Sequence, residues 1–310
     1  MGEMIEGVWH RENAVPTQDN AFQRKPTTFR ATIEPGGTFP PQVGRYQLYV
    51  SRACPWAHRT LIFRTLKGLE DIVGLSVTHW LMAEDGWNFA PGAGVVADPV
   101  LAATFLHQLY AKADPHFSGR VTVPVLWDRA TNSIVNNDSA DIIRIFNRAF
   151  DGIGATEGDY APQGLRAQID TVNARIYETV NNGVYRAGFA RSQAAYDAAV
   201  VPLFATLDWL EARLAGQAFL CGDTMTEADW RLFTTLVRFD AVYHGHFKCN
   251  LRRLVDYPAL WAYARRLYQW PGVAATVDFD HIKRHYYMSH PWVNPSRIVP
   301  AGPMHDWLAK

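Results

Sequence analysis

The sequence has few cysteines, no excess of charge of either sign and no long apolar run. Cys54, Cys221 and Cys249 are the only thiols in 310 residues. They cannot form a disulfide framework, and they lack the paired spacing typical of metal ligands. The 30 Lys and Arg residues balance the 30 Asp and Glu residues, so no net field draws the chain to nucleic acid or anionic lipid. No apolar stretch reaches the roughly 18 residues of a membrane span. We therefore expect free thiols and no metal, nucleic-acid or membrane partner.

The opening residues, MGEMIEGVWHRENAVPTQDN, also lack the pattern of a secretory signal. They carry acidic residues, and they have no basic end followed by an apolar core. Unpaired thiols suit a reducing compartment. These features together predict a cytoplasmic protein.

The chain is long enough for two domains, and its composition, 48% hydrophobic and 19% charged, is that of a folded globular protein. Residues 1–44 are polar, dotted with proline and without periodicity, which predicts an irregular N-terminal arm. Residues 45–150 read as strand, helix, strand, β-hairpin and helix, which is the order of a small α/β sandwich. Between its second and third strands, residues 83–118 form a segment longer than a plain connection needs.

The second half of the chain has a different pattern. Residues 151–164 are Gly-rich and polar and predict a linker. Residues 165–290 contain only segments of helical period, each ended by Gly or Pro, so they predict an all-helical domain. Residues 291–310 remain as a C-terminal tail.

The stretch SRACPWAHRT places Cys54 where a strand-like run turns into a helix. We expect Cys54 at the N-cap and Pro55 at the first helical position, where the missing N–H costs nothing. The helix dipole and free amide groups favour an anion there, and Arg52, Arg59 and His58 add positive charge. These groups should lower the pKa of the Cys54 thiol. The pattern therefore predicts a reactive thiolate rather than a buried packing cysteine.

A dithiol enzyme would place a second cysteine three residues later, but position 57 is Ala. A mixed disulfide on Cys54 must then be cleared by an external thiol, which we expect to be glutathione. A cis Val123–Pro124 bond would turn the backbone polar groups of Val123 outward to pair with an extended peptide. The alternative for this motif is an ordinary edge-strand proline.

The stretch NNDSAD supplies a further piece of a tripeptide site. Ser139 at a helix N-terminus can hold a carboxylate, and Asp138 can pair with an ammonium. Those two groups form the γ-glutamyl end of glutathione. Taken alone, the same residues are equally consistent with simple helix capping.

Four motifs in chain order resemble one family: LYVSRACPWAHRTLI, GRVTVPVLWD, NNGVYRAGFA and RFDAVYHGHFKCN. They are similar to the cytosolic glutathione transferases, and most similar to the xi class, the glutathionyl-hydroquinone reductases. The resemblance covers residues 40–290. It implies a thioredoxin-like N-terminal domain, an all-helical C-terminal domain and a homodimer built through the helical domains.

The resemblance also implies roles for individual residues. Cys54 would be the nucleophile, and Asp138 stands where this class usually has the longer Glu. The expected glutathione-binding residues are Trp56, Trp87, Arg120, the backbone of Val123, Asp138 and Ser139. The expected hydroquinone-side tyrosines, which would donate hydrogen bonds or a proton, are Tyr185, Tyr243 and Tyr286.

The activity implied is removal of glutathione from a glutathionyl-hydroquinone through a Cys54 mixed disulfide, with a second glutathione releasing oxidised glutathione. One alternative is an omega-like thioltransferase or dehydroascorbate reductase, which would share Cys54 and differ in its second pocket. Another is a noncatalytic binding protein of the same fold. The pairs His244 and His246, and His281 and His285, lack a converging third ligand, so we expect no metal site. In TEADW, the spacing of Thr226 and Asp229 predicts a helix-capping box.

Overall fold

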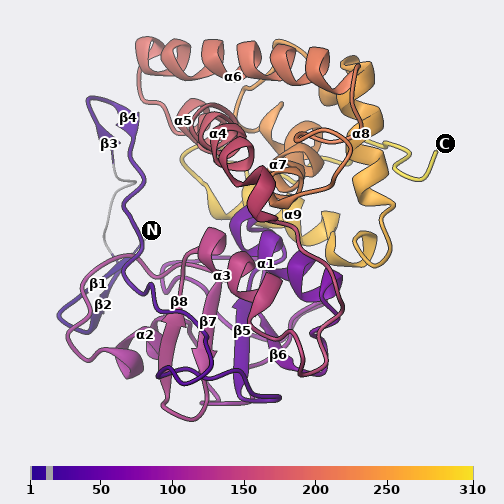
Figure 1. Ribbon diagram of the computed structural model, residues 1–310. Helices are drawn as coiled ribbons and strands as arrows, with labels where there is room; N and C mark the ends of the chain where they lie inside the picture. Colours follow the sequence, from indigo (N-terminus) through magenta and orange to yellow (C-terminus); the bar gives the residue numbers. More distant parts are fainter. Residues whose placement is uncertain (1, 12–16, 310) are drawn as a thin grey trace. The chain divides into compact units, whose positions relative to one another are not determined.

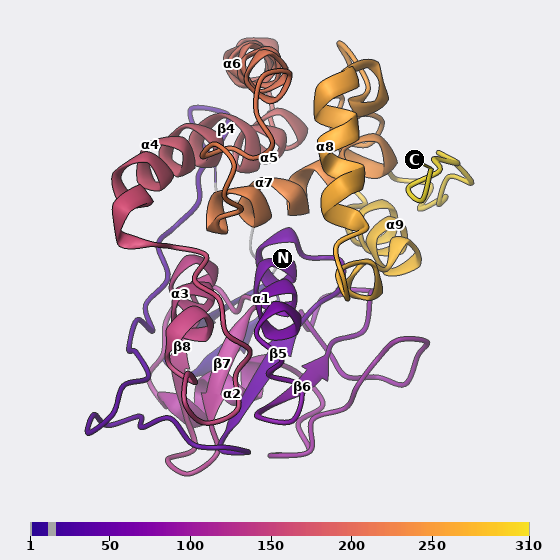
Figure 2. The ribbon, with the colours of Figure 1, turned by 45° about the vertical axis from the view of Figure 1, so that its right-hand side comes forward.

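The computed structural model describes residues 2–11 and 17–309 (Figures 1 and 2). These residues divide into two compact units. Unit 1 contains residues 2–11, 25–158 and 276–285, and unit 2 contains residues 17–24, 159–275 and 286–309. Residues 1, 12–16 and 310, which fall in the predicted arm and tail, lie outside the described part of the chain.

Unit 1 is built on a four-stranded sheet of order β6-β5-β7-β8. The strands are β5 (Tyr46–Val50), β6 (Val73–Val77), β7 (Val125–Asp128) and β8 (Ser133–Asn136). Strand β5 pairs parallel with β6 and antiparallel with β7, and β7 forms the predicted hairpin with β8. Every residue of β5 is buried, as expected for a central strand covered on both faces. This sheet confirms the predicted thioredoxin-like order.

Three helices accompany the sheet of unit 1. They are α1 (Pro55–Leu66), α2 (His107–Ala113) and α3 (Ser139–Arg148). Helices α1 and α3 pack against each other (Figure 2), which brings their N-terminal ends into one region of the unit. Helix α2 lies in the long insertion after β6, where Leu106, Leu109 and Tyr110 are fully buried. The insertion is therefore part of the folded unit.

The structure differs from the predicted irregular arm, because residues 3–22 contain two short hairpins. They consist of β1 (Glu3–Ile5) with β2 (Val8–His10), and β3 (Thr17–Gln18) with β4 (Ala21–Phe22). Met4 is 1% exposed, and its backbone exchanges two 2.9 Å hydrogen bonds with Gly119. Strands of two or three residues are too short to show a period of two, so the sequence pattern could not reveal them.

Unit 2 is helical. Its elements are α4 (Arg166–Ile176), η2 (Tyr177–Asn181), α5 (Gly183–Gly188), α6 (Gln193–Leu214), α7 (Glu227–Arg238), η3 (Phe239–Tyr243) and α8 (Pro258–Tyr268). Short 3-10 turns occupy Gln163–Leu165, Leu254–Asp256 and Ala274–Thr276. Helix α9 (Phe279–Ser289) belongs to both units, with residues 286–289 counted in unit 2. Among the described residues, no helix combines the length and apolar character needed to cross a bilayer.

The predicted capping box at the start of α7 is present and buried. Asp229 accepts hydrogen bonds from the backbone N–H and the hydroxyl of Thr226, at 2.8 and 3.1 Å. It also accepts from the Leu220 N–H and the Tyr263 hydroxyl, both at 2.8 Å. Burial raises the pKa of Asp229, although these hydrogen bonds oppose the rise. One carboxyl group thus fixes the N-terminus of α7 to two other segments of unit 2.

Candidate functional site

Cys54 occupies the predicted N-cap of α1, with Pro55 at the first helical position. Its backbone is extended, and the thiol is partly exposed, directly before a turn of amide groups without helical partners. The Cys54 Sγ lies 3.7 Å from the Val123 carbonyl oxygen, to which it donates. The Val123–Pro124 peptide is cis, which is the first of the two interpretations that the sequence left open for this motif. The Cys54 thiol thus lies at the N-terminus of α1, beside the backbone of the cis Val123–Pro124 peptide.

Arg59 connects the cysteine helix to α3. Its side chain is 2% exposed, and its guanidinium lies 4.5 Å from the centre of the Trp56 ring. Its Nη1 donates to the Ser139 hydroxyl oxygen at 3.3 Å. A buried positive charge is thus held between the first turns of α1 and α3. Two helix N-termini and a guanidinium form a favourable environment for an anionic ligand.

Asp138 and Ser139 form the N-terminus of α3, as predicted. Asp138 is the N-cap, and its Oδ1 accepts from the Ala140 N–H at 2.8 Å. Its Oδ2 accepts from the Thr27 hydroxyl at 3.2 Å and lies 3.7 Å from Arg30 Nη1. Asp138 therefore caps α3 as predicted, and its Oδ2 contacts Thr27 and Arg30 from the N-terminal region.

The other predicted glutathione-side residues also lie in unit 1. Trp87 is 8% exposed and stacks on the His285 ring, with centroids 4.9 Å apart. The His285 Nδ1 lies 2.9 Å from the Trp80 carbonyl oxygen, so this α9 residue contacts both the insertion and the segment just before it. Arg120 is partly buried and precedes Val123 by three residues. His58, expected to add charge near the thiol, lies fully buried with Nε2 2.7 Å from the Thr276 hydroxyl.

Unit 2 brings the three predicted tyrosines together from α5, η3 and α9. The Tyr286 hydroxyl lies 2.5 Å from that of Tyr185 and 3.1 Å from that of Tyr243. All three side chains are buried, at 9% exposure or less. We call this arrangement, Tyr185–Tyr286–Tyr243, the phenol chain. Residues separated by up to about a hundred positions thus form one hydrogen-bonded group.

The environment keeps Tyr243 and Tyr286 of the phenol chain protonated. Burial raises the pKa of Tyr243 and of Tyr286 well above the ordinary tyrosine value, and the neighbouring phenol of Tyr185 adds to the rise. The charge of Arg238 acts in the opposite direction without overcoming burial. These hydroxyls can therefore act as hydrogen-bond and proton donors at neutral pH.

An aromatic wall surrounds the phenol chain. The Phe247 ring stacks on Tyr243 and meets the edges of Tyr185 and Tyr286, each at 5.5 Å between centroids. Gly188 permits this packing, because a Cβ at that position would lie 2.2 Å from the Phe247 ring. The surroundings of the phenol hydroxyls are therefore largely apolar and aromatic.

Sequence reasoning missed Arg238. Its side chain is fully buried, and Nη1 donates to the Thr234 carbonyl oxygen at 2.7 Å. Its charge lowers the pKa of two phenols in the chain, so it favours negative charge on their oxygens. The available signal was its place at the head of the motif RFDAVYHGHFKCN, five residues before Tyr243.

The histidine pairs have other partners. His246 Nε2 lies 3.2 Å from His290 Nδ1, and His281 Nε2 lies 2.6 Å from the Ala93 carbonyl oxygen. Across residues 2–11 and 17–309, no cluster of three or more His, Cys, Asp or Glu side chains could hold a metal ion.

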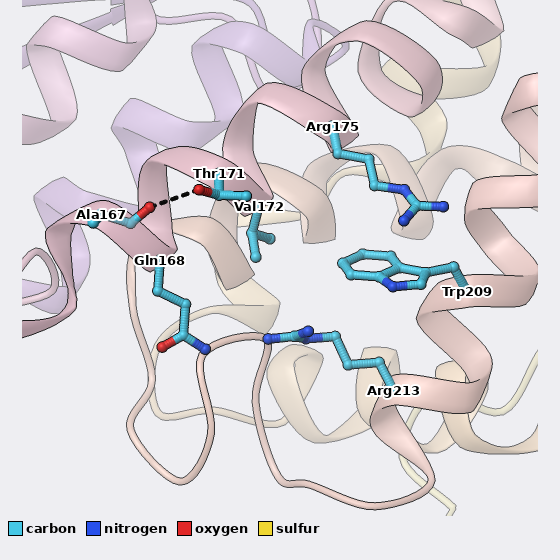
Figure 3. A pocket seen from close by; sticks show the side chains of 7 residues that line it. All are labelled: Ala167, Gln168, Thr171, Val172, Arg175, Trp209 and Arg213. Carbon is cyan, nitrogen blue, oxygen red and sulfur yellow. Dashed lines mark hydrogen bonds between the residues drawn. The ribbon is translucent and has the colours of Figure 1, made fainter.

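Unit 2 also has a separate hollow of about 420 Å³ between α4 and α6 (Figure 3). In it, Trp209 lies between Arg175 and Arg213, whose guanidiniums are 4.2 and 5.2 Å from the indole. None of the predicted site residues lines this hollow, so it is distinct from the phenol chain. Its lining consists of Ala167, Gln168, Thr171, Val172, Arg175, Trp209 and Arg213.

Comparisons with known proteins give the family. The family model "Glutathione S-transferase, N-terminal domain" matches residues 53–149, and "Glutathione S-transferase, C-terminal domain" matches residues 193–266. Glutathionyl-hydroquinone reductase PcpF of Sphingobium chlorophenolicum is 53% identical over 98% of this chain and 96% of its own length. Glutathionyl-hydroquinone reductase YqjG of Escherichia coli is 52% identical over 99% of this chain and 96% of its own length.

Solved structures agree with this placement. The glutathione-bound structure of Escherichia coli YqjG, described as a glutathione transferase homologue, superposes with a TM-score of 0.89 at 52% identity, covering 99% of this chain and 97% of that one. The Xi class transferase of Natrialba magadii gives a TM-score of 0.94 at 48% identity, covering 100% and 95%. The chain therefore belongs to the glutathione S-transferase family, within the Xi class that contains the glutathionyl-hydroquinone reductases.

Proposed function

We propose that this protein is a glutathionyl-hydroquinone reductase that uses glutathione as its co-substrate. The phenol chain is the observation that carries this function. Exchange between two sulfur atoms needs only a thiolate and a glutathione site. Removing a hydroquinone from sulfur also needs a proton donor and hydrogen bonds to phenolic oxygens, and Tyr185, Tyr243 and Tyr286 can supply both.

The first half-reaction starts from the Cys54 thiolate and a glutathionyl-hydroquinone. The Cys54 sulfur attacks the glutathionyl sulfur, a sulfur–sulfur bond forms, and the carbon–sulfur bond to the ring breaks. The ring carbon keeps the electron pair of the broken bond and takes up one proton. The products are free hydroquinone and glutathione held as a mixed disulfide on Cys54. The two sulfur atoms have been oxidised, and the ring has been reduced.

The second half-reaction regenerates the thiolate. The thiolate of a second glutathione attacks the glutathionyl sulfur of the mixed disulfide and expels the Cys54 thiolate. Oxidised glutathione leaves, so the net reaction consumes one glutathionyl-hydroquinone and one glutathione. Because position 57 is Ala, no neighbouring thiol competes for the mixed disulfide.

The chemistry of Asp138, Ser139 and Val123 supports their assignment to the glutathione side, and the class resemblance implies the assignment of Trp56, Trp87 and Arg120. Asp138 would pair with the ligand ammonium, and Ser139 with the α3 N-terminus would hold the γ-glutamyl carboxylate. The Val123 backbone would pair with the cysteinyl part of the tripeptide. Trp56, Trp87 and Arg120 would complete the site. Position and exposure in unit 1 support these assignments.

Two further properties follow from the same chemistry. We propose a cytoplasmic location, since the cycle consumes reduced glutathione and all three cysteines are free thiols. We also propose a homodimer, as the class resemblance implies. Cell fractionation checks the location. Sedimentation at micromolar concentration checks the dimer, which a monomer mass would contradict.

The test is single turnover of a glutathionyl-hydroquinone by the wild type, by Cys54→Ala and by Cys221→Ala. Wild type should release hydroquinone and gain the mass of one glutathionyl group on the Cys54 peptide. Cys54→Ala should do neither, because it lacks the nucleophile. Cys221→Ala removes a buried thiol and should react as the wild type does. Rapid exchange with small mixed disulfides, without release of hydroquinone, would instead indicate an omega-like thioltransferase.

A further inference from the structure

Part of the N-terminal region packs on the phenol chain. Residues 17–24 belong to unit 2, although residues 2–11 and 25–158, the described stretches before and after this segment, are assigned to unit 1. Within unit 2, the Arg191 N–H donates to the Asn20 carbonyl oxygen at 3.1 Å. Strand β4 contacts α5, the helix that carries Tyr185 (Figure 2). This segment thus contacts a helix of the proposed ring site, by which we mean the phenol chain and the Phe247 ring that packs on it.

Phe22 gives the segment an apolar anchor. Its side chain is 5% exposed, and its ring meets the edge of Phe189 with centroids 5.4 Å apart. It also lies against Tyr185, at 6.4 Å between centroids. Burying an aromatic side chain of this size is strongly favourable. The anchor is therefore strong enough to hold a short segment on α5.

The guanidinium of Arg24 lies over the ring of Tyr185. Its guanidinium carbon is 5.1 Å from the centre of the Tyr185 ring, within the range of a cation–π contact. Its Nε donates to the Asn182 side-chain oxygen at 2.8 Å, and Asn182 is 3% exposed. A buried acceptor therefore fixes the guanidinium over the ring.

A cation over a phenol ring affects the phenol as a donor. When the Tyr185 hydroxyl donates toward a ring oxygen or a leaving carbon, negative charge builds on its own oxygen and ring. A guanidinium above the face stabilises that charge, and the contact strengthens as the ring becomes richer in electrons. The charge is also held in place before the reaction, so no reorganisation is needed.

We propose that Arg24 is a positioning residue of the ring site, which orients Tyr185 and stabilises the negative charge that builds on it while the hydroquinone leaves. This inference rests on the proposed reductase function. It assigns the segment Asn20–Arg24 a part in the first half-reaction and none in the second. The glutathione-side residues are all outside unit 2.

The experiment compares Arg24→Met, which keeps the stem and removes the charge, with Arg24→Lys, which keeps the charge. Arg24→Met should slow hydroquinone release in single turnover about fivefold, the loss expected for one exposed cation–π contact. Glutathione-dependent discharge of a preformed Cys54 mixed disulfide should stay at the wild-type rate. Arg24→Lys should restore most of the lost rate. Lys25→Met, an equal loss of charge one residue later, should react as the wild type does.

The outcomes separate this inference from the function on which it rests. A wild type that releases no hydroquinone would overturn the proposed function. Release by the wild type with an equal rate for Arg24→Met would overturn the role of Arg24 alone. Equal slowing of both half-reactions, or the same deficit in Arg24→Lys as in Arg24→Met, would also overturn it, since folding alone would then explain the effect.

Discussion

Tyr286 contacts both other tyrosines of the phenol chain through its hydroxyl group. Its hydroxyl lies 2.5 Å from that of Tyr185 and 3.1 Å from that of Tyr243. A proton leaving one end of the chain can be replaced from the other end through this oxygen. Its pKa is raised well above the usual value, chiefly by burial. Tyr286 should therefore matter more than either neighbour.

We predict that Tyr286→Phe slows hydroquinone release in single turnover about 100-fold, the scale of lost general-acid catalysis. Tyr185→Phe and Tyr243→Phe each remove only one of the two hydrogen bonds that Tyr286 makes within the phenol chain, so each should cost about tenfold. Rapid quench across the three variants, with thermal melts to confirm folding, gives the comparison. Equal rates for all three variants and the wild type would remove the phenol chain from the mechanism.

Site residues that lie in local sequence motifs could be predicted, whereas residues whose role depends on contacts with distant segments of the chain were missed. Cys54 could be found because its neighbours Pro55 and Ala57 define its chemistry locally. Arg24 could not be found this way, since its target ring lies on α5, far along the chain. No local period or spacing encodes such a contact.

At the level of elements, two π-helical turns stand next to tyrosines of the site. The turn η2 ends two residues before α5, which carries Tyr185, and η3 ends at Tyr243. Turns of this kind shift the register of a helix and are common at functional sites. The sequence predicts continuous helices over 165–185 and 226–244, because apolar period alone does not distinguish an α turn from a π turn. Helix α9 was not individually predicted either, since FDHIKRHYYMS is rich in His and aromatic residues of modest helix propensity.

The capping box of α7 should be a strong determinant of stability. Asp229→Ala leaves four buried donors without their shared acceptor. We predict a loss of about 3 kcal/mol in the free energy of unfolding, since hydrogen bonds to a buried carboxylate are removed together. Denaturant titration followed by circular dichroism measures this loss.

A matched control is the N-cap of α6. Ser192 caps that helix through one bond to the Ala195 N–H at 3.2 Å. Ser192→Ala should cost only about 1 kcal/mol, as for an ordinary cap. If both variants lost the same amount, the four-way role of Asp229 would be refuted.

For the whole molecule, the two units divide the proposed chemistry between them. Cys54, Asp138 and the other glutathione-side residues belong to unit 1, and the phenol chain belongs to unit 2. Turnover of a small glutathione mixed disulfide needs only the glutathione-side residues, because the sulfur that leaves does not carry a hydroquinone ring. Turnover of a glutathionyl-hydroquinone needs the glutathione-side residues and the phenol chain. Substitutions in the two units should therefore differ in which substrate they affect.

Asp138→Asn tests the glutathione-side residues without removing the helix cap, because Asn caps a helix as well as Asp does. The variant keeps an oxygen for the Ala140 N–H and loses the charge that would pair with the glutathione ammonium. We predict that KM for glutathione rises roughly tenfold with either substrate, the loss of one charge-assisted bond. Tyr286→Phe should leave turnover of the mixed disulfide unchanged while it slows release of hydroquinone.

Steady-state rates of both variants on both substrates decide the question. An Asp138→Asn enzyme with unchanged KM would mean that the carboxylate serves only as the cap that its bond to Ala140 shows. A Tyr286→Phe enzyme impaired equally on both substrates would mean that the phenol chain supports the fold of unit 2 or the Cys54 thiolate, and not the departing ring. The proposed roles require an Asp138→Asn defect on both substrates together with a Tyr286→Phe defect confined to the glutathionyl-hydroquinone.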